Sequence, residues 1–138
     1  MNEQVDIKID WDVFSRTRAE LGQGFVRILG YFREDGAKSV SAIEDAVRKG
    51  SAAPLVLPAH KLKSEAREFG ALGLATLAEH IEMTARDFVE WHQDPGTLVE
   101  YVVNLRPLLD ATIAALDEEI NPLAQRRPGS GSVFARSA

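Results

Sequence analysis

The hydrophobic positions of this chain recur every three or four residues along most of its length, which is the period of an amphipathic helix. Over residues 21–47 this spacing predicts one long helix with a single apolar stripe. Gly36 lies inside the stripe and weakens the helix by about 1 kcal/mol without ending it. Gly50 and Ser51 end the helix, and a short helix capped by Asp10 or Asp12 is expected to precede it.

A third helix is predicted to end at Gly70, because glycine is the usual residue after a helix C-terminus. Its start is less defined, since Pro54 suits a first turn but Pro58 removes a further backbone donor. We expect either a late start or a distorted first turn. A fourth helix begins near Leu72 or Gly73 and keeps an apolar stripe as far as the turn signal that follows it.

The last helix is predicted over residues 98–120, with a kink at Pro107. Together these elements predict an all-α fold, an up-and-down antiparallel four-helix bundle with a short extra N-terminal helix, over residues 10–120. Residues 1–9 form a separate N-terminal segment. Residues 121–138 shift to proline, arginine, glycine and serine, which predicts a disordered tail.

The amino-acid composition excludes several classes of protein and of binding partner. A chain of 138 residues with 45% hydrophobic and 27% charged residues fits one domain with a real core. No apolar run is long enough to span a membrane, and the N-terminus lacks a signal peptide, so we expect a cytoplasmic protein. The absence of cysteine excludes disulfides, and the net charge of −5 argues against nucleic acid or acidic membrane as a partner. No glycine-rich phosphate loop and no metal-binding motif occur, so neither kinase activity nor a metal site is expected.

His60 lies on a polar face of the third helix. On a helical wheel it shares this face with Lys63, Ser64, Arg67 and Ala71. The apolar residues of the same helix lie on the opposite side (Leu55, Ala59, Leu62, Ala66 and Phe69). His60 is therefore predicted to point away from the core. A solvent-exposed imidazole is largely neutral near pH 7, so a nitrogen nucleophile is available.

The run from Ala59 to Glu82 resembles the signature of the histidine-containing phosphotransfer (HPt) domain family. That signature is His-x-Leu-Lys-Gly, then a small residue, then an apolar-Gly-Ala step, and then a helix that ends in leucine or isoleucine followed by glutamate or glutamine. The matching residues are His60, Leu62, Lys63, Ala66, Phe69, Gly70, Ala71, Leu77, Ile81 and Glu82. The sequence departs from the family at Ser64, where glycine is usual, and a bulky Glu65 follows it.

The resemblance implies that His60 accepts a phosphoryl group and that Lys63 stabilises the phosphohistidine. It also implies that Glu82 accepts a hydrogen bond from the other imidazole nitrogen; the alternative is a plain surface carboxylate. Arg67 could neutralise phosphate oxygens or be a solvated cation. The implied protein is a phosphoryl carrier rather than a turnover enzyme. Its implied partners are response-regulator receiver domains, whose aspartates exchange the phosphoryl group with His60, and a hybrid histidine kinase. No cofactor of its own is implied, since the Mg²⁺ belongs to the receiver, and a monomer suffices.

Candidate docking residues surround His60. Val56 and Leu57 would flank it as an apolar rim if the helix extends that far, or would pack under the N-terminal helix. Small residues would leave room for a partner's backbone, and the candidate binding set is Val56, Leu57, Ser64, Arg67, Gly70 and Ala71. Two alternative functions stay open: an HPt-like module that docks a receiver or kinase and regulates it without accepting phosphate, and an ordinary helical scaffold.

Overall fold

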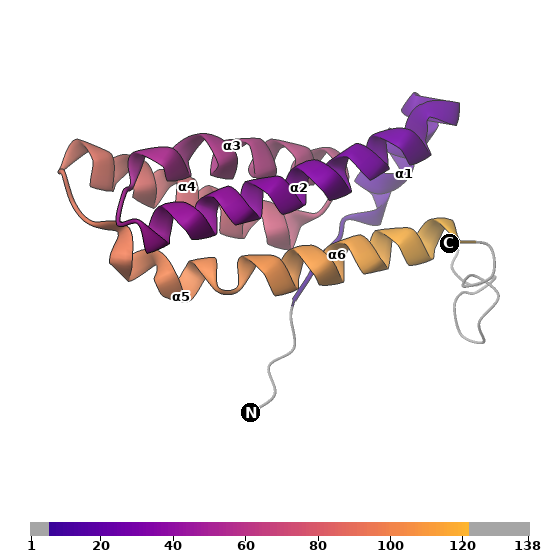
Figure 1. Cartoon of the computed structure of the whole chain (residues 1–138). Coiled ribbons are helices and arrows are strands. Elements are labelled where there is room, and N and C mark those ends of the chain that lie inside the picture. The colour runs from indigo at the N-terminus through magenta and orange to yellow at the C-terminus, as the bar shows by residue number, and fades with distance from the viewer. Residues whose placement is uncertain (1–5, 122–138) are drawn as a thin grey trace.

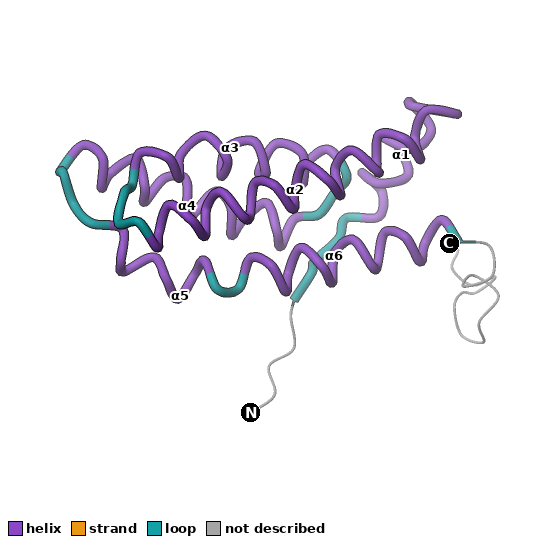
Figure 2. Tube along the Cα trace, viewed as in Figure 1, coloured by secondary structure: helices purple, strands orange, loops and turns teal. Residues whose placement is uncertain are grey.

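The computed structural model describes residues 6–121, and Figure 1 shows that its long helices lie side by side as a bundle. The helices are α1 (Trp11–Leu21), η1 (Gly22–Gly24), α2 (Phe25–Arg48), α3 (Ala53–Glu68), α4 (Leu72–Glu90), η2 (Pro95–Leu98), α5 (Val99–Val102) and α6 (Leu105–Ile120). Short loops join them (Figure 2), so successive long helices run in opposite directions. The predicted all-α four-helix bundle with an extra N-terminal helix is confirmed.

A row of phenylalanine rings closes the end of the bundle where α1 lies. Phe14 of α1 makes an edge contact with Phe25, at 5.3 Å between ring centroids. Phe69, just after α3, makes an edge contact with Phe25 at 5.8 Å and stacks on Phe32 at 5.2 Å. All four rings are buried. This packing fixes α1 against α2 and against the end of α3, so Phe14 belongs to the core.

Asp10 is the N-cap of α1. Its side chain accepts hydrogen bonds from the backbone N–H groups of Asp12 at 3.0 Å and Val13 at 3.2 Å. Of the two caps that the sequence offered, the structure therefore uses Asp10, and Asp12 lies in the first turn, where its charge suits the helix dipole.

The segment just before α1 pairs with the turn between α3 and α4. Three backbone hydrogen bonds join the two: Asp10 N–H to Gly70 O (2.8 Å), Leu72 N–H to Lys8 O (3.0 Å) and Gly73 N–H to Ile7 O (3.2 Å). The sequence pattern predicts that residues 1–9 lie outside the bundle. The described part of that segment, residues 6–9, belongs to it, because these bonds satisfy backbone groups of the turn.

Gly70 is needed where this pairing occurs. Its φ of +77° is strained for any residue with a side chain. A Cβ at this position would also lie 2.5 Å from the carbonyl oxygen of Asp10. Gly70 therefore serves two purposes. It lets the chain turn after α3, and its lack of a side chain lets the N-terminal segment pack against that turn.

Two prolines act differently from the expectation. Pro58 lies inside α3, which begins at Ala53, so the helix starts earlier than the late start considered from the sequence. Pro107 was expected to kink a continuous helix over residues 98–120. Instead that segment divides into η2, α5 and α6, and Pro107 is the third residue of α6. Because proline lacks an N–H and its ring clashes with the carbonyl four residues earlier, the helix restarts at Leu105.

Within residues 6–121, no helix combines the length and the apolar character that crossing a membrane requires. The predicted disordered tail lies outside the described residues, apart from Asn121, which caps α6.

Candidate functional site

His60 lies in the middle of α3 with its side chain 49% exposed. The buried face of the same helix consists of Leu55, Ala59, Leu62 and Ala66. The predicted orientation of His60, away from the core, is therefore confirmed. One edge of the ring faces solvent, where another molecule can reach it.

The other edge of the ring faces Glu82 of α4. His60 Nδ1 lies 3.0 Å from Glu82 Oε2. The carboxylate is buried, with only 3% of its side chain exposed. Glu82 is therefore not the plain surface carboxylate that the sequence left as an alternative. Burial of an acidic side chain requires charged or hydrogen-bonding partners, and the structure supplies them.

Two cations share this carboxylate with the imidazole. Lys63 Nζ lies 2.7 Å from Glu82 Oε1, and the lysine side chain is only 12% exposed. Arg86, one turn after Glu82 on α4, donates from Nε at 3.1 Å and from Nη2 at 2.8 Å to Oε2. The carboxylate thus has partners at both oxygens, and three side chains from two helices meet on it.

These contacts control the ionisation of Glu82. Burial alone would raise the pKa of Glu82, but the hydrogen bonds from Lys63, Arg86 and His60 outweigh burial and lower this pKa to about 2. Glu82 is therefore an anion at neutral pH, and an ionised carboxylate accepts hydrogen bonds but cannot donate them. His60 Nδ1 must then carry the proton. In a neutral ring this leaves the lone pair on Nε2, which is the arrangement a nucleophile needs.

Arg67 and Ser64 lie on the same face of α3 as His60. Ser64 is exposed, as the helical wheel predicts. Arg67 is half exposed and pairs with Glu79 of α4, with 3.0 Å between Nη2 and Oε1. The guanidinium of Arg67 is thus held by a surface ion pair two turns from His60 and does not join the cluster around Glu82.

Gly70 and Ala71 do not lie on the docking face, so the prediction that they leave room for a partner is wrong. Both are buried, and Ala71 has no exposed area. The helical wheel assumed that α3 continues to Ala71, but the helix ends at Glu68. The chain's own N-terminal segment covers this turn, and Ile9 pairs with Ala71 there.

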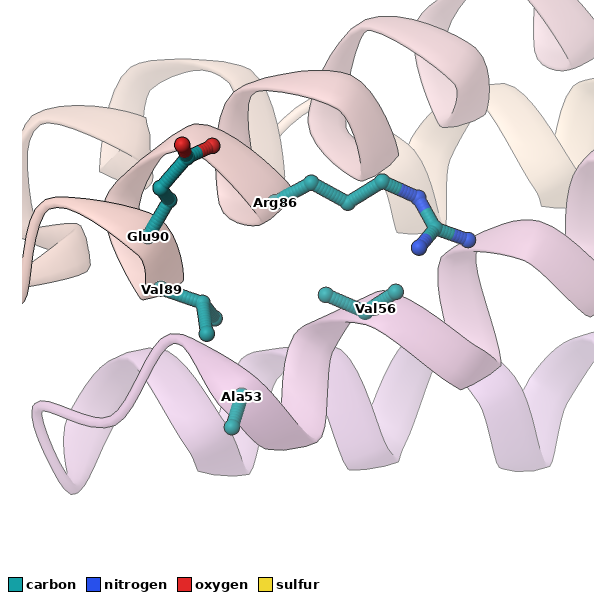
Figure 3. A pocket seen from close by; sticks show the side chains of 5 residues that line it. All are labelled: Ala53, Val56, Arg86, Val89 and Glu90. Carbon is teal, nitrogen blue, oxygen red and sulfur yellow. The ribbon is translucent and has the colours of Figure 1, made fainter.

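Val56 and Leu57 lie one turn before His60, at the end of α3 opposite to α1 (Figure 1), so neither packs under α1. Leu57 is 73% exposed. Val56 faces a shallow open groove of about 330 Å³ between the start of α3 and the end of α4, lined by Ala53, Val56, Arg86, Val89 and Glu90. In Figure 3, Val56 and Val89 face each other across this groove, and Arg86 extends past Val56, away from Ala53.

Arg86 is the member of the cluster that sequence analysis missed. Its spacing from Glu82 is the i, i+4 spacing at which a glutamate and an arginine meet on a helix, so a signal was present. Its importance depends on how α4 packs against α3, which the spacing does not specify. Within residues 6–121, the His60–Glu82 cluster included, no group of three or more acidic, histidine or cysteine side chains is arranged to hold a metal ion.

Comparison with known proteins shows which fold and which protein family this chain resembles. Among solved structures, the crystal structure of histidine-containing phosphotransfer protein B (HptB) from Pseudomonas aeruginosa PAO1 is similar, with a TM-score of 0.71 and 20% sequence identity. The match covers 87% of this chain and 96% of that chain, and it supports the fold. No curated protein sequence matches. The family model described as the Hpt domain matches residues 27–123, well over half of the chain. This range contains α3, α4 and α6, all of α2 except its first two residues, and the His60–Glu82 pair. The chain therefore belongs to the Hpt domain family.

Proposed function

We propose that this protein is a phosphorelay carrier in two-component signalling and that Nε2 of His60 is the atom that accepts the phosphoryl group. One observation carries the proposal: a buried, ionised Glu82 lies 3.0 Å from Nδ1 of a half-exposed histidine. Glu82 keeps the proton on Nδ1, so the exposed nitrogen is the nucleophile. Membership in the Hpt domain family supports the same chemistry.

In the proposed step, Nε2 attacks the phosphorus of an aspartyl phosphate on a receiver domain. The N–P bond forms as the P–O bond to aspartate breaks, and the aspartate leaves as a carboxylate. The ring gains positive charge, which Glu82 stabilises through the Nδ1–H hydrogen bond. Lys63 is placed to pair with phosphoryl oxygens, since it lies one turn from His60 on α3. Transfer to the aspartate of a second receiver is the reverse of this step, with Mg²⁺ held by the receiver.

We further propose that receiver domains dock over the apolar rim beside His60. Leu57 is the most exposed of the large hydrophobic side chains within residues 6–121, and the groove at Val56 continues the same surface towards α4. Exposed apolar area next to a reactive polar group is the usual character of a docking surface. A hybrid histidine kinase would reach the site through its own receiver domain.

The test of the phosphoacceptor is direct labelling. The protein is incubated with phosphorylated receiver domains, and acid-labile, base-stable label is counted. His60→Gln should abolish labelling with the helical content unchanged. His80→Gln, at an exposed position of α4, is the matched control and should label normally. Label that survives in His60→Gln would refute the assignment. Receiver binding without any label on the unmodified protein would favour the regulatory docking module.

The test of the docking surface uses a charge at the rim. Leu57→Asp should weaken transfer at low receiver concentration and leave the rate at saturating receiver within about twofold, because a rim contact affects encounter and affinity more than the chemical step. Val26→Asp, at a 64% exposed position near the start of α2, is the control. Equal effects of both substitutions would place docking elsewhere.

A further inference from the structure

Arg86 contacts the same oxygen of Glu82 that His60 does. Both Nε and Nη2 of the arginine donate to Oε2, and His60 Nδ1 donates to it as well. Lys63 instead pairs with Oε1. The two cations are therefore divided between the two oxygens of one buried carboxylate, and only Arg86 shares an oxygen with the imidazole.

This division matters once His60 carries a phosphoryl group. The group adds negative charge next to Lys63, whose ammonium then has two competing anions, the phosphoryl oxygens and Glu82. If Lys63 turns to the phosphoryl group, Oε1 of Glu82 loses its partner while the carboxylate stays buried. A buried carboxylate without a counter-charge is strongly disfavoured, so another cation must compensate it.

We infer that Arg86 is a positioning residue that keeps Glu82 ionised and oriented towards His60 Nδ1, so that Lys63 is free to pair with the phosphoryl group. The inference rests on the proposed function and adds a residue to it. Arg86 acts through Glu82 and need not contact the phosphoryl group. Its role follows from the negative charge at position 82, because a neutral amide there would need no compensating cation.

Arg86 could instead contact a docking partner, because it also lines the groove beside Val56 and Val89 (Figure 3). As a docking side chain it would affect partner binding whatever residue stands at position 82. The two roles therefore differ in whether the effect of Arg86 depends on Glu82, and a double-mutant cycle measures that dependence.

The cycle compares the wild-type protein, Arg86→Gln, Glu82→Gln and the double variant. Phosphoramidate is the phosphoryl donor, so no docking partner takes part: its P–N bond breaks, ammonia leaves and the bond to His60 Nε2 forms. Arg86→Gln alone should slow labelling by about tenfold, the loss expected for one charge-assisted contact. In the Glu82→Gln background, the same substitution should change the rate by less than about twofold.

Three further measurements complete the test. ¹⁵N NMR of the unphosphorylated protein should show a smaller fraction of the Nδ1–H form of His60 in Arg86→Gln than in the wild type. Arg86→Lys, which keeps the charge, should restore most of the labelling rate. Arg33→Gln, which removes a cation of α2 that pairs with Asp117 of α6 and not with Glu82, should leave labelling and the tautomer unchanged.

An equal rate loss in both backgrounds, or no loss in either, would overturn the inference. So would an unchanged tautomer in Arg86→Gln. Failure of the wild-type protein to label at His60 would instead refute the proposed function. The NMR measurement would still test the link from Arg86 through Glu82 to His60 in that case, because it needs no phosphoryl group.

Discussion

Replacing Glu82 by glutamine tests how strongly its neighbours hold the carboxylate in the ionised form. The substitution keeps the size and shape of the side chain but removes its charge. In the folded protein, burial would raise the pKa of Glu82, but the hydrogen bonds from Lys63, Arg86 and His60 lower it to about 2, against 4.5 for an ordinary glutamate. A folded-state pKa below the unfolded value adds stability above pH 4.5, and this stability is lost as the pH falls towards 2.

The size of the effect follows from the difference between the two pKa values. At about 1.4 kcal/mol for each pH unit, the ionised carboxylate contributes on the order of 3 kcal/mol to stability at pH 7. The same relation leaves about 1.4 kcal/mol at pH 3 and about 0.4 kcal/mol at pH 2. We therefore expect Glu82→Gln to be less stable than the wild type at pH 7 by up to about 3 kcal/mol, and the difference to close between pH 4.5 and pH 2.

Urea denaturation followed by circular dichroism at pH 7, 5, 3 and 2, at one ionic strength, measures this difference. Glu79→Gln is the matched control, because Glu79 is also on α4 and paired with an arginine but is 45% exposed. Its difference from the wild type should stay within about 1 kcal/mol at every pH, as is usual for surface ion pairs. A destabilisation of Glu82→Gln that does not change with pH, or that is absent at pH 7, would refute the reasoning.

Three other substitutions give separate tests. Gly70→Ala should cost about 2 kcal/mol or more in urea denaturation, because it combines left-handed strain with a clash against the N-terminal segment. Gly30→Ala on α2 should be neutral or stabilising, because a Cβ there would meet only the Arg33 side chain, at 4.0 Å. Burial, with the nearby charge of Asp35, raises the pKa of Glu65 to about 7, so this carboxyl is destabilising once ionised. Glu65→Gln should then be more stable than the wild type at pH 8, on the order of 1 kcal/mol after allowance for solvent screening, and equally stable at pH 4; a difference that does not change between these pH values would contradict this. Lys63→Gln should shorten the lifetime of the phosphohistidine by about tenfold, measured as loss of label from the isolated protein. An unchanged lifetime would refute the proposal that Lys63 stabilises the phosphohistidine.

The sequence predicted correctly the features that are set by the residue spacing within one helix. The apolar stripe of α3 is read from residues close together in the chain, so the outward direction of His60 followed from spacing alone. The contact between His60 and Glu82 came from the resemblance to the family, because a helical wheel does not place one helix against another. Arg86 was missed for the same reason, since its spacing from Glu82 was visible but its closeness to the imidazole was not.

The errors arose where the chain leaves a helix. Gly70 and Ala71 were placed by extending α3 beyond its last turn. Residues 6–9 were left outside the bundle because the pairing of a short extended segment with a distant turn has no local signature. A kink was predicted at Pro107, whereas the helix breaks between Val102 and Leu105, just before Pro107. Proline restricts the preceding turn in either case, and the packing of α5 and α6 decides between the two outcomes.

The two halves of the site are only 22 positions apart and belong to one helical hairpin, α3 and α4. Contacts between residues close in the chain cost little loop-closure entropy, so they can form early in folding. His60 can therefore meet Glu82 as soon as the hairpin forms, before α6 joins the bundle. Transient detachment of α6 would likewise leave the pair together, and amide hydrogen exchange should then be slower in α3 and α4 than in α6. The geometry of the reactive centre is thus set within one helical hairpin, and residues of both its helices, α3 and α4, form the cluster around Glu82.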